Sequence, residues 1–562
     1  MKLRTQFLLL AAVTLSFIFA SCSKTNEQGK LVPNDAAIVM HINGQSLSSK
    51  LPWEEIKANP LFQKMYADST IPAFVKNILD NPENSGINIK SDFIFFAKQD
   101  TSGSLAAFEG SVKDTEKFKL FNQEATKGGS ETEKGGLHFI SRSPACVGWN
   151  KDRFVYVFST PDFRKRSGTN TMTDQTKPID LLAACKAIFD LPAKNSLGSN
   201  EKFTALMKKA GDFHIWINTE EITKSAQSMA ALSMLKMDKL YEGSLTVGTA
   251  NFENGKIAVD FKSYTGKLLN DLLKKYSGDK INEDMLKRIP AKDVAAIFAL
   301  NFKPEGINEL LKMMGMDGLA NIGISTMGFS LDDFIKANKG DILVAVTDIK
   351  TNPDTIHLQN DASAVVGKSA KPDFIFAASI GDKESFNKLI AAGKKLMGPK
   401  MVYSDSAAPD LSYNLNADYF AIGNSKEKVD KYIAGGNSNF DFMSKFSGNP
   451  FGGYINLQYI MKAMETEMTK DSSAKIAFAA SMKMWDNVYM TGGKYADGGI
   501  SYSMEINLVD KTSNSLKQLN LYLGKLSFLE KWRKDKQELS DLRMEEINKD
   551  EMTAPEAPTK EK

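Results

Sequence analysis

The chain has few residues of the kinds that build disulfide-stapled or metal-binding proteins. Its 562 residues include three cysteines and four histidines. Three cysteines exclude a fold held together by many disulfides. The histidines are far apart in the sequence and show no metal-ligand spacing. No GxSxG elbow, HExxH motif, CxxC pair, phosphate-binding loop or EF-hand loop is present. The sequence therefore predicts no metal and no cofactor, and it assigns no catalytic residue.

An excess of charge of either sign is also missing. The chain has 71 Lys and Arg residues against 68 Asp and Glu residues, and the two signs are dispersed. Nucleic-acid binders show basic patches, so the charge pattern argues against a nucleic-acid partner. The 42% hydrophobic content is that of a globular protein, and the length implies at least two domains.

Long apolar runs are scarce, and the clearest one lies at the start of the chain. Lys2 and Arg4 precede an uncharged apolar run from Phe7 to Ala20. This run is shorter than the roughly 18 apolar residues that a transmembrane helix needs. It is typical of a secretory signal that is removed after export.

The end of this run resembles a bacterial lipobox, with Phe19, Ala20 and Ser21 before Cys22. The resemblance implies that residues 1–21 are a signal peptide, that Cys22 is lipidated, and that residues 22–30 form a flexible tether. Two or more acyl chains would then anchor the protein stably to a membrane. The alternative is a soluble exported protein in which Cys22 carries no lipid.

The other two cysteines, Cys146 and Cys185, leave two states open. They could form one disulfide in an oxidising compartment. They could equally be two unpaired buried thiols, because a disulfide requires a short distance that the sequence does not reveal.

The chain also resembles itself. Segments beginning at residues 31, 111, 150, 213 and 249 have counterparts, in the same order, beginning at residues 288, 379, 416, 451 and 492. This ordered series predicts two divergent copies of one domain, residues 31–285 and 286–525. Both copies mix alternating strand patterns with amphipathic helices, so we expect an α+β fold with mostly antiparallel sheet packed against helices.

The matching segments predict local structure as well. Asp114 and Asp382 stand at expected helix N-caps, and Phe118 and Phe386 are the first core-facing residues of those helices. Asn-Gly at residues 254–255 and Asp-Gly at 497–498 are hairpin turn signals.

Beyond the second copy, residues 526–550 show helical spacing of apolar residues, and residues 551–562 are expected to be disordered. The helix could dock a partner or pack on its own domain. The 25 methionines include three clusters on expected helices, which could form the core or line an adaptable groove.

The signal and tether, together with VPNDAAIVMHING and VGWNKDRFVYVFS, resemble an uncharacterised family of Bacteroidetes lipoproteins known only as a domain of unknown function. The resemblance implies a cell-envelope protein, lipid-anchored to the outer membrane through Cys22, on either its periplasmic or its surface side. It implies no site residues.

Three hypotheses for function remain. The leading one is a non-catalytic binding or scaffold lipoprotein with a protein or glycan partner. The second is an envelope hydrolase with a dispersed site, since paired carboxylates are identified only by their separation in space. The third is a carrier of an apolar ligand, which would require an apolar cavity between a sheet and helices.

Overall fold

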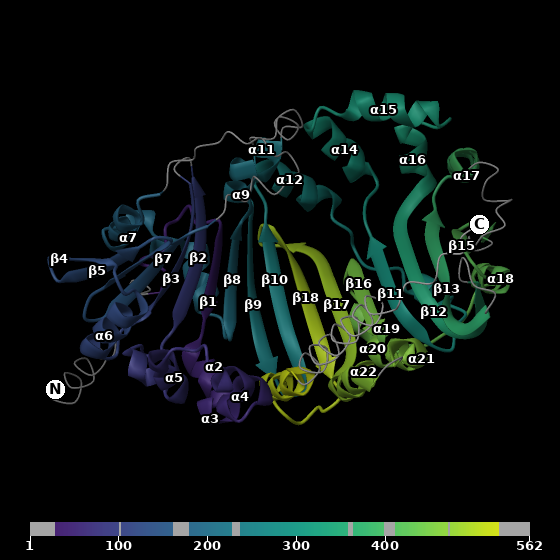
Figure 1. Cartoon of the computed structure of the whole chain (residues 1–562). Helices are drawn as coiled ribbons and strands as arrows, with labels where there is room; N and C mark the ends of the chain where they lie inside the picture. The colour runs from purple at the N-terminus through teal and green to yellow at the C-terminus, as the bar shows by residue number, and fades with distance from the viewer. Residues whose placement is uncertain are drawn as a thin grey trace, which may run out of the picture.

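One antiparallel sheet of 18 strands runs through the whole molecule (Figure 1). The computed structural model describes residues 28–100, 103–160, 179–226, 237–357, 364–397, 411–469 and 472–527. Helices cover parts of both faces of the sheet, which confirms the predicted α+β class with antiparallel pairing. In the described ranges, no helix is both long enough and apolar enough to cross a bilayer.

The first half of the chain supplies ten strands from one edge of the sheet to its middle. In spatial order they are β4 (Ser130–Lys134), β5 (Leu137–Arg142), β6 (Ala145–Trp149), β7 (Arg153–Ser159), β3 (Gly103–Ser111), β2 (Phe93–Asp100), β1 (Ile38–Ile42), β8 (Phe213–Asn218), β9 (Leu245–Glu253) and β10 (Lys256–Tyr264).

The second half continues from the middle to the other edge. Its strands are, in order, β18 (Gly499–Leu508), β17 (Trp485–Ala496), β16 (Phe451–Asn456), β11 (Val294–Asn301), β12 (Asn338–His357), β13 (Ala364–Ile380), β15 (Tyr419–Gly423) and β14 (Ser412–Leu415). Strands β10 and β18 pair along their length and join the halves. We call this pair the seam.

The two halves pair their strands in the same order. The series β6, β7, β3, β2, β1, β8, β9, β10 corresponds to β14, β15, β13, β12, β11, β16, β17, β18. Each predicted match between segments falls on corresponding elements of this series. The common origin of the halves and the limits of the two domains stay predictions.

The predicted local signals are confirmed. Two-residue turns at 254–255 and 497–498 close the hairpins β9–β10 and β17–β18. Asp114 caps α6 (Thr115–Ala125), since its carboxylate accepts the Lys117 amide hydrogen. Asp382 accepts the Ser385 amide hydrogen at the start of α17 (Lys383–Met397).

Each half has its own main core, and both cores lie on the same face of the sheet, here called the covered face. In the first half, α7 (Leu181–Phe189) and α8 (Glu201–Met207) pack over buried residues of β1, β2, β7 and β8. In the second half, α13 (Glu283–Lys287), α18 (Lys426–Ala434) and α19 (Phe442–Phe446) do the same over β11 to β13.

The opposite face, here called the open face, is covered near its two edges. Phe118 of α6 packs on Trp149 and Phe154 at one edge. Phe386 of α17 packs on Phe420 near the other. Both phenylalanines are buried, as predicted from the sequence.

Further helices gather at the two ends of the strands (Figure 1). At one end lie α2 (Gly44–Lys50), α3 (Trp53–Lys57), α4 (Pro60–Ala67), α5 (Ala73–Asp80), the short η1 (Pro82–Ser85) and a helix over residues 515–527. At the other end lie α9 (Thr219–Ala226), α11 (Met237–Tyr241), α12 (Lys267–Tyr276), α14 (Glu305–Met313), α15 (Asp317–Thr326) and α16 (Leu331–Ala337). The remaining helices are η3 (Ala193–Asn195), η4 (Leu197–Ser199), α20 (Leu457–Ala463), α21 (Glu465–Met468) and α22 (Ser472–Met484).

Several predictions concern residues outside the described ranges. These are the signal peptide 1–21, Cys22 with its lipobox, the tail 551–562, and all but the first two residues of the expected helix 526–550.

Candidate apolar binding face

The seam reverses the usual arrangement of apolar and polar residues. Because side chains alternate along a strand, Ile257, Val259 and Phe261 of β10 share one face, and Lys256 and Asp260 share the other. An antiparallel sheet commonly turns its apolar side to the core. At the seam the apolar side is the open face instead. None of these three apolar side chains is fully buried.

An apolar pocket lies on the open face at one end of the seam. It is bounded by strand residues Ile42, Phe93, Phe213 and Phe252 and by helices α2 and α3, and its volume is about 410 Å³. Most of the other lining residues are also apolar: Leu47, Leu51, Trp53, Ile56, Pro82, Ile89 and Leu516. We call it the α2 pocket, and its size falls within the range of small-molecule sites.

A second pocket lies on the same face toward the opposite end of the strands. Leu273 and Tyr276 of α12 form its roof, and Leu300, Phe451 and Tyr502 come from the sheet. Its volume is also about 410 Å³. We call it the α12 pocket.

The strand register connects the two pockets by an apolar strip. Phe252 of the α2 pocket stands directly opposite Ile257, and Val259 and Phe261 follow on the same side of β10. Phe261 in turn stands opposite Tyr502 of the α12 pocket. Directly opposed residues lie within side-chain contact, so the strip is continuous.

The strip is long enough for a lipid chain. From Ile257 to Phe261, β10 extends about 13 Å at the rise of a β-strand, and the two pockets extend the apolar surface beyond both ends of the strip. An acyl chain that spans one leaflet of a bilayer is about 15 Å long, because the hydrocarbon core formed by both leaflets is about 30 Å thick.

The open face carries no charged side chain across its middle. From β1 through the seam to β11, the open-face positions named by the register hold no Asp, Glu, Lys or Arg. Several large apolar residues there are exposed, and Tyr502 keeps 40% of its surface accessible. The others are Ile38, Phe298, Leu300 and Val344. Contiguous exposed apolar surface is typical of binding sites, so the open face is the candidate site.

A buried carboxylate holds one wall of the α2 pocket. Asp212 accepts hydrogen bonds from Lys50 Nζ at 2.6 Å and from Ser46 Oγ at 2.6 Å. It also accepts the amide hydrogen of Phe252 at 2.6 Å. These bonds tie α2 to β9, so the helix and strand that bound the pocket are fixed to each other.

Two histidines far apart in the sequence meet on the covered face beneath this pocket. His41 of β1 and His214 of β8 stand opposite each other, with their Nδ1 atoms 2.9 Å apart. His41 Nε2 lies 3.3 Å from Asp92 Oδ2, and His214 Nε2 lies 3.0 Å from the Lys209 carbonyl oxygen. Burial lowers the pKa of His214. Both rings are sealed from solvent, so they offer no site to a substrate.

The sequence showed only that the histidines are far apart and did not predict that these two pair. They are 173 positions apart with no motif that links them, and only the strand register brings them together.

The predicted cysteine pair is brought together inside the first core. Cys146 of β6 and Cys185 of α7 are both buried, and the structure has them as free thiols. The neighbouring Cys146 thiol and burial raise the pKa of the Cys185 thiol. The disulfide between them stays a prediction. Among the described residues, no cluster of His, Cys, Asp and Glu has the geometry to hold a metal ion.

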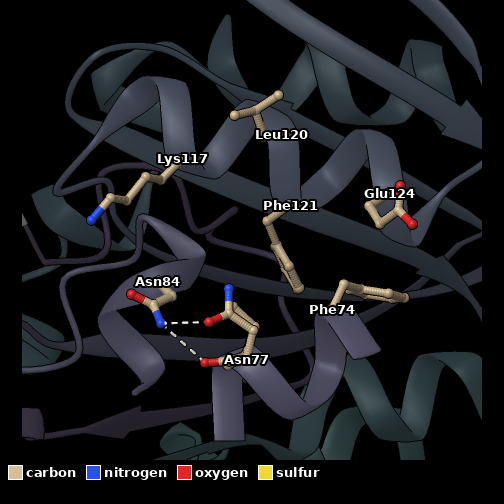
Figure 2. A pocket seen from close by; sticks show the side chains of 8 residues that line it. Phe74, Asn77, Asn84, Lys117, Leu120, Phe121 and Glu124 are labelled. Atoms are coloured by element: carbon tan, nitrogen blue, oxygen red, sulfur yellow. Dashed lines mark hydrogen bonds between the residues drawn. The ribbon is translucent and has the colours of Figure 1, made fainter. Parts of the chain in front are cut away.

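A third hollow lies between α5 and α6 (Figure 2). Phe74 and Phe121 line it together with Asn77 and Asn84. The Asn84 amide donates to both the backbone and the side-chain oxygen of Asn77, at 3.1 and 3.0 Å. The Asn84 amide is therefore already hydrogen-bonded to Asn77, and this hollow is a weaker candidate for a ligand site than the open face.

The family of the chain follows from a match over most of its length. Residues 29–400 match the model of a family described as "Domain of unknown function (DUF4836)". The chain belongs to this family. The DUF4836 match begins within the predicted tether, residues 22–30, and runs past the seam strand β10 to three residues beyond α17, so it includes parts of both halves.

The other comparisons are weaker. No curated protein matches this DUF4836 chain at a significant level. Among solved structures, "crystal form I of TP0453" has 10% identity and a TM-score of 0.24, covering 42% of this chain and 78% of that chain. "Crystal form III of TP0453" has 10% identity and a TM-score of 0.26, covering 46% and 91%. TM-scores at this level carry no argument about fold or function.

Proposed function

We propose that this protein is a lipid-anchored envelope protein whose body binds an apolar chain, such as the acyl chain of a lipid, along the open face of its sheet. Of the three hypotheses drawn from the sequence, this is the carrier of an apolar ligand, in place of the leading hypothesis of a binding or scaffold module. The proposed ligand lies along the apolar strip between the α2 pocket and the α12 pocket.

The observation that carries the proposal is the reversed seam. A soluble sheet gains stability when its apolar side is covered, yet Ile257, Val259 and Phe261 face a side that the described helices leave partly open. A bound hydrocarbon chain would cover this surface. Since no charge lies at the open-face positions across the middle of the sheet, such a ligand would meet no unpaired buried ion there.

The chemistry of the face favours binding over catalysis. Hydrolysis needs a nucleophile or a pair of acid and base groups that reach the substrate. The open-face positions of the seam carry only apolar, Ser and Tyr side chains. The scaffold hypothesis requires a protein or glycan partner, and no comparable feature of the described residues favours such a partner.

The anchor remains part of the proposal. Cys22, preceded by Phe19, Ala20 and Ser21, would attach the chain to a membrane, with the outer membrane as the proposed location. Replacing Cys22 by Ser should release the protein from the membrane fraction into the soluble fraction of the envelope. Unchanged sedimentation with membranes would contradict the lipid anchor.

Ligand binding is tested by displacement of a fluorescent fatty acid from the mature chain that carries Cys22→Ser. Unlabelled fatty acids of increasing length should compete better. Each added methylene contributes about 0.8 kcal/mol when buried, or about fourfold in affinity. The affinity should stop increasing once the acyl chain is longer than the strip.

Two neighbouring residues of β18 provide a matched pair of variants. Tyr502→Glu places a carboxylate on the open face, whereas Ser501→Glu places the same group on the opposite face of the same strand. Tyr502→Glu should weaken fatty-acid binding at least about tenfold, because a buried carboxylate beside the ligand is costly. Equal affinities for the two variants would argue against the open face as the site.

A further inference from the structure

Three helices, α12, α14 and α15, form a ridge beside the α12 pocket. Helix α12 contacts α14, and α14 contacts α15, which leads on to α16. Figure 1 shows them along one end of the strands. None of the three has a fully buried residue, although α12 contains four leucines and α14 two. Helices that contribute to a core bury an apolar stripe, so packing among the described residues covers the apolar residues of the ridge only in part.

Helix α15 is the most apolar and the most exposed part of the ridge. Its ten residues, DGLANIGIST, include one charged residue, Asp317. Leu319 is 69% exposed and Ile322 is 66% exposed. These two residues are three positions apart, so they lie on the same side of the helix. Leaving two large aliphatic side chains in water forgoes the free energy that their burial would release.

The ridge adjoins the α12 pocket. Leu273 and Tyr276, which roof the α12 pocket, belong to the last turns of α12. On the same helix Leu268 is exposed, and Lys274 and Lys275 follow in the last turn. An amphipathic helix with exposed leucines and flanking lysines is suited to the interface of a lipid bilayer.

The described chain begins at the other end of the strands. Gln28, the first described residue, donates a hydrogen bond to Asp92, which directly precedes β2 at the end that carries α2. The first described residue therefore lies at the end of the strands opposite to the ridge. Lipid docking by the side chains of the ridge can be tested without the anchor, in the chain that carries Cys22→Ser.

We propose that the ridge formed by α12, α14 and α15 docks on a lipid surface, so that an acyl chain passes between the bilayer and the α12 pocket. This inference rests on the proposed function, because it identifies the α12 pocket as the place where the ligand enters the apolar strip. The near absence of charge on α15 favours insertion of its aliphatic side chains into the bilayer interface over docking to a charged protein surface.

The test is flotation of the mature chain carrying Cys22→Ser with vesicles of phosphatidylcholine. The chain should float with the vesicles, and anionic phosphatidylglycerol should add little, because the four lysines of α12, α14 and α15 are balanced by four acidic residues. The double variant Leu319→Glu with Ile322→Glu should lower the partition coefficient at least about tenfold, since each buried aliphatic side chain contributes about a factor of ten or more.

The matched control replaces two equally exposed leucines elsewhere. Leu120 of α6 is 63% exposed, and Leu521 in the helix over residues 515–527 is 65% exposed. Figure 2 shows Leu120 at the edge of the hollow between α5 and α6, and Figure 1 shows α6 on the opposite side of the molecule from α15. The double variant Leu120→Glu with Leu521→Glu should keep the flotation of the parent chain.

The outcomes separate the docking proposal from the proposed function. Lost flotation of the α15 variant with unchanged fatty-acid binding in free solution supports docking by the ridge. Flotation of the α15 variant equal to that of the parent overturns it, as does self-association of the chain through Leu319 in place of vesicle binding. If no fatty acid binds but flotation depends on α15, docking stands and the carrier function fails.

Discussion

His41 Nδ1 and His214 Nδ1 lie 2.9 Å apart across the strand pair β1–β8, so one ring must donate a hydrogen bond to the other. The Lys209 carbonyl can only accept, which puts a proton on His214 Nε2. With His214 neutral, its Nδ1 accepts from His41. The remaining nitrogen of His41, Nε2, lies 3.3 Å from Asp92 Oδ2.

We predict that this pair makes stability depend on pH. Burial lowers the pKa of His214, so below about pH 6.5, the ordinary value for histidine, the unfolded state binds more protons than the folded state. The free energy of unfolding should therefore fall as pH drops from 7 to 5. The titratable groups that act on His214 are His41, Asp92 and Lys209.

Urea unfolding at pH 7 and pH 5 measures this effect. His214→Gln should reduce the pH dependence, whereas His138→Gln should leave it unchanged, because His138 is a partly exposed residue on β5. An identical pH dependence in the two variants would contradict the role of His214.

The buried Asp212 should be a main support of the α2 pocket. We expect Asp212→Asn to lower the free energy of unfolding by about 3 kcal/mol, because the Lys50 ammonium loses its charged partner in a buried setting. The exposed Asp260 on β10 is the control, and Asp260→Asn should change the free energy of unfolding by less than about 0.5 kcal/mol. Urea unfolding compares the two, and equal losses would refute the assignment.

The two states of Cys146 and Cys185 can be separated by thiol labelling. If both are free and buried, a thiol reagent should modify neither in the native mature chain carrying Cys22→Ser. After denaturation it should modify two thiols per chain. Mass spectrometry gives the count, and two unmodified cysteines after denaturation without reductant would show the disulfide.

Helix α6 contains a matched test of core packing. Phe118 is fully buried between Trp149 and Phe154, whereas Leu120 on the same helix is exposed. Phe118→Ala should cost about 3–5 kcal/mol of unfolding free energy, and Leu120→Ala less than about 0.5 kcal/mol. Denaturant unfolding measures both, and similar costs would mean that α6 does not hold the open face at this edge.

The sequence by itself determined the local features of this protein. The Asp-Gly turn at 497–498 requires positive φ angles that these two residues accept readily, and both have them, so its hairpin was predictable. Asp114 and Phe118 follow from the chemistry of a helix start and from helical periodicity. The order of matching segments even anticipated which strands of the two halves would correspond.

Tertiary structure alone decided the candidate site. Alternation in β10 separates Ile257, Val259 and Phe261 from Lys256 and Asp260, but it does not say which side a helix covers. The pairing of β10 with β18 turns the apolar sides of both strands to the open face. In the same way, the register of β1 and β8 brought His41 to His214. Strand pairing depends on long-range contacts, which the local pattern of residues does not encode.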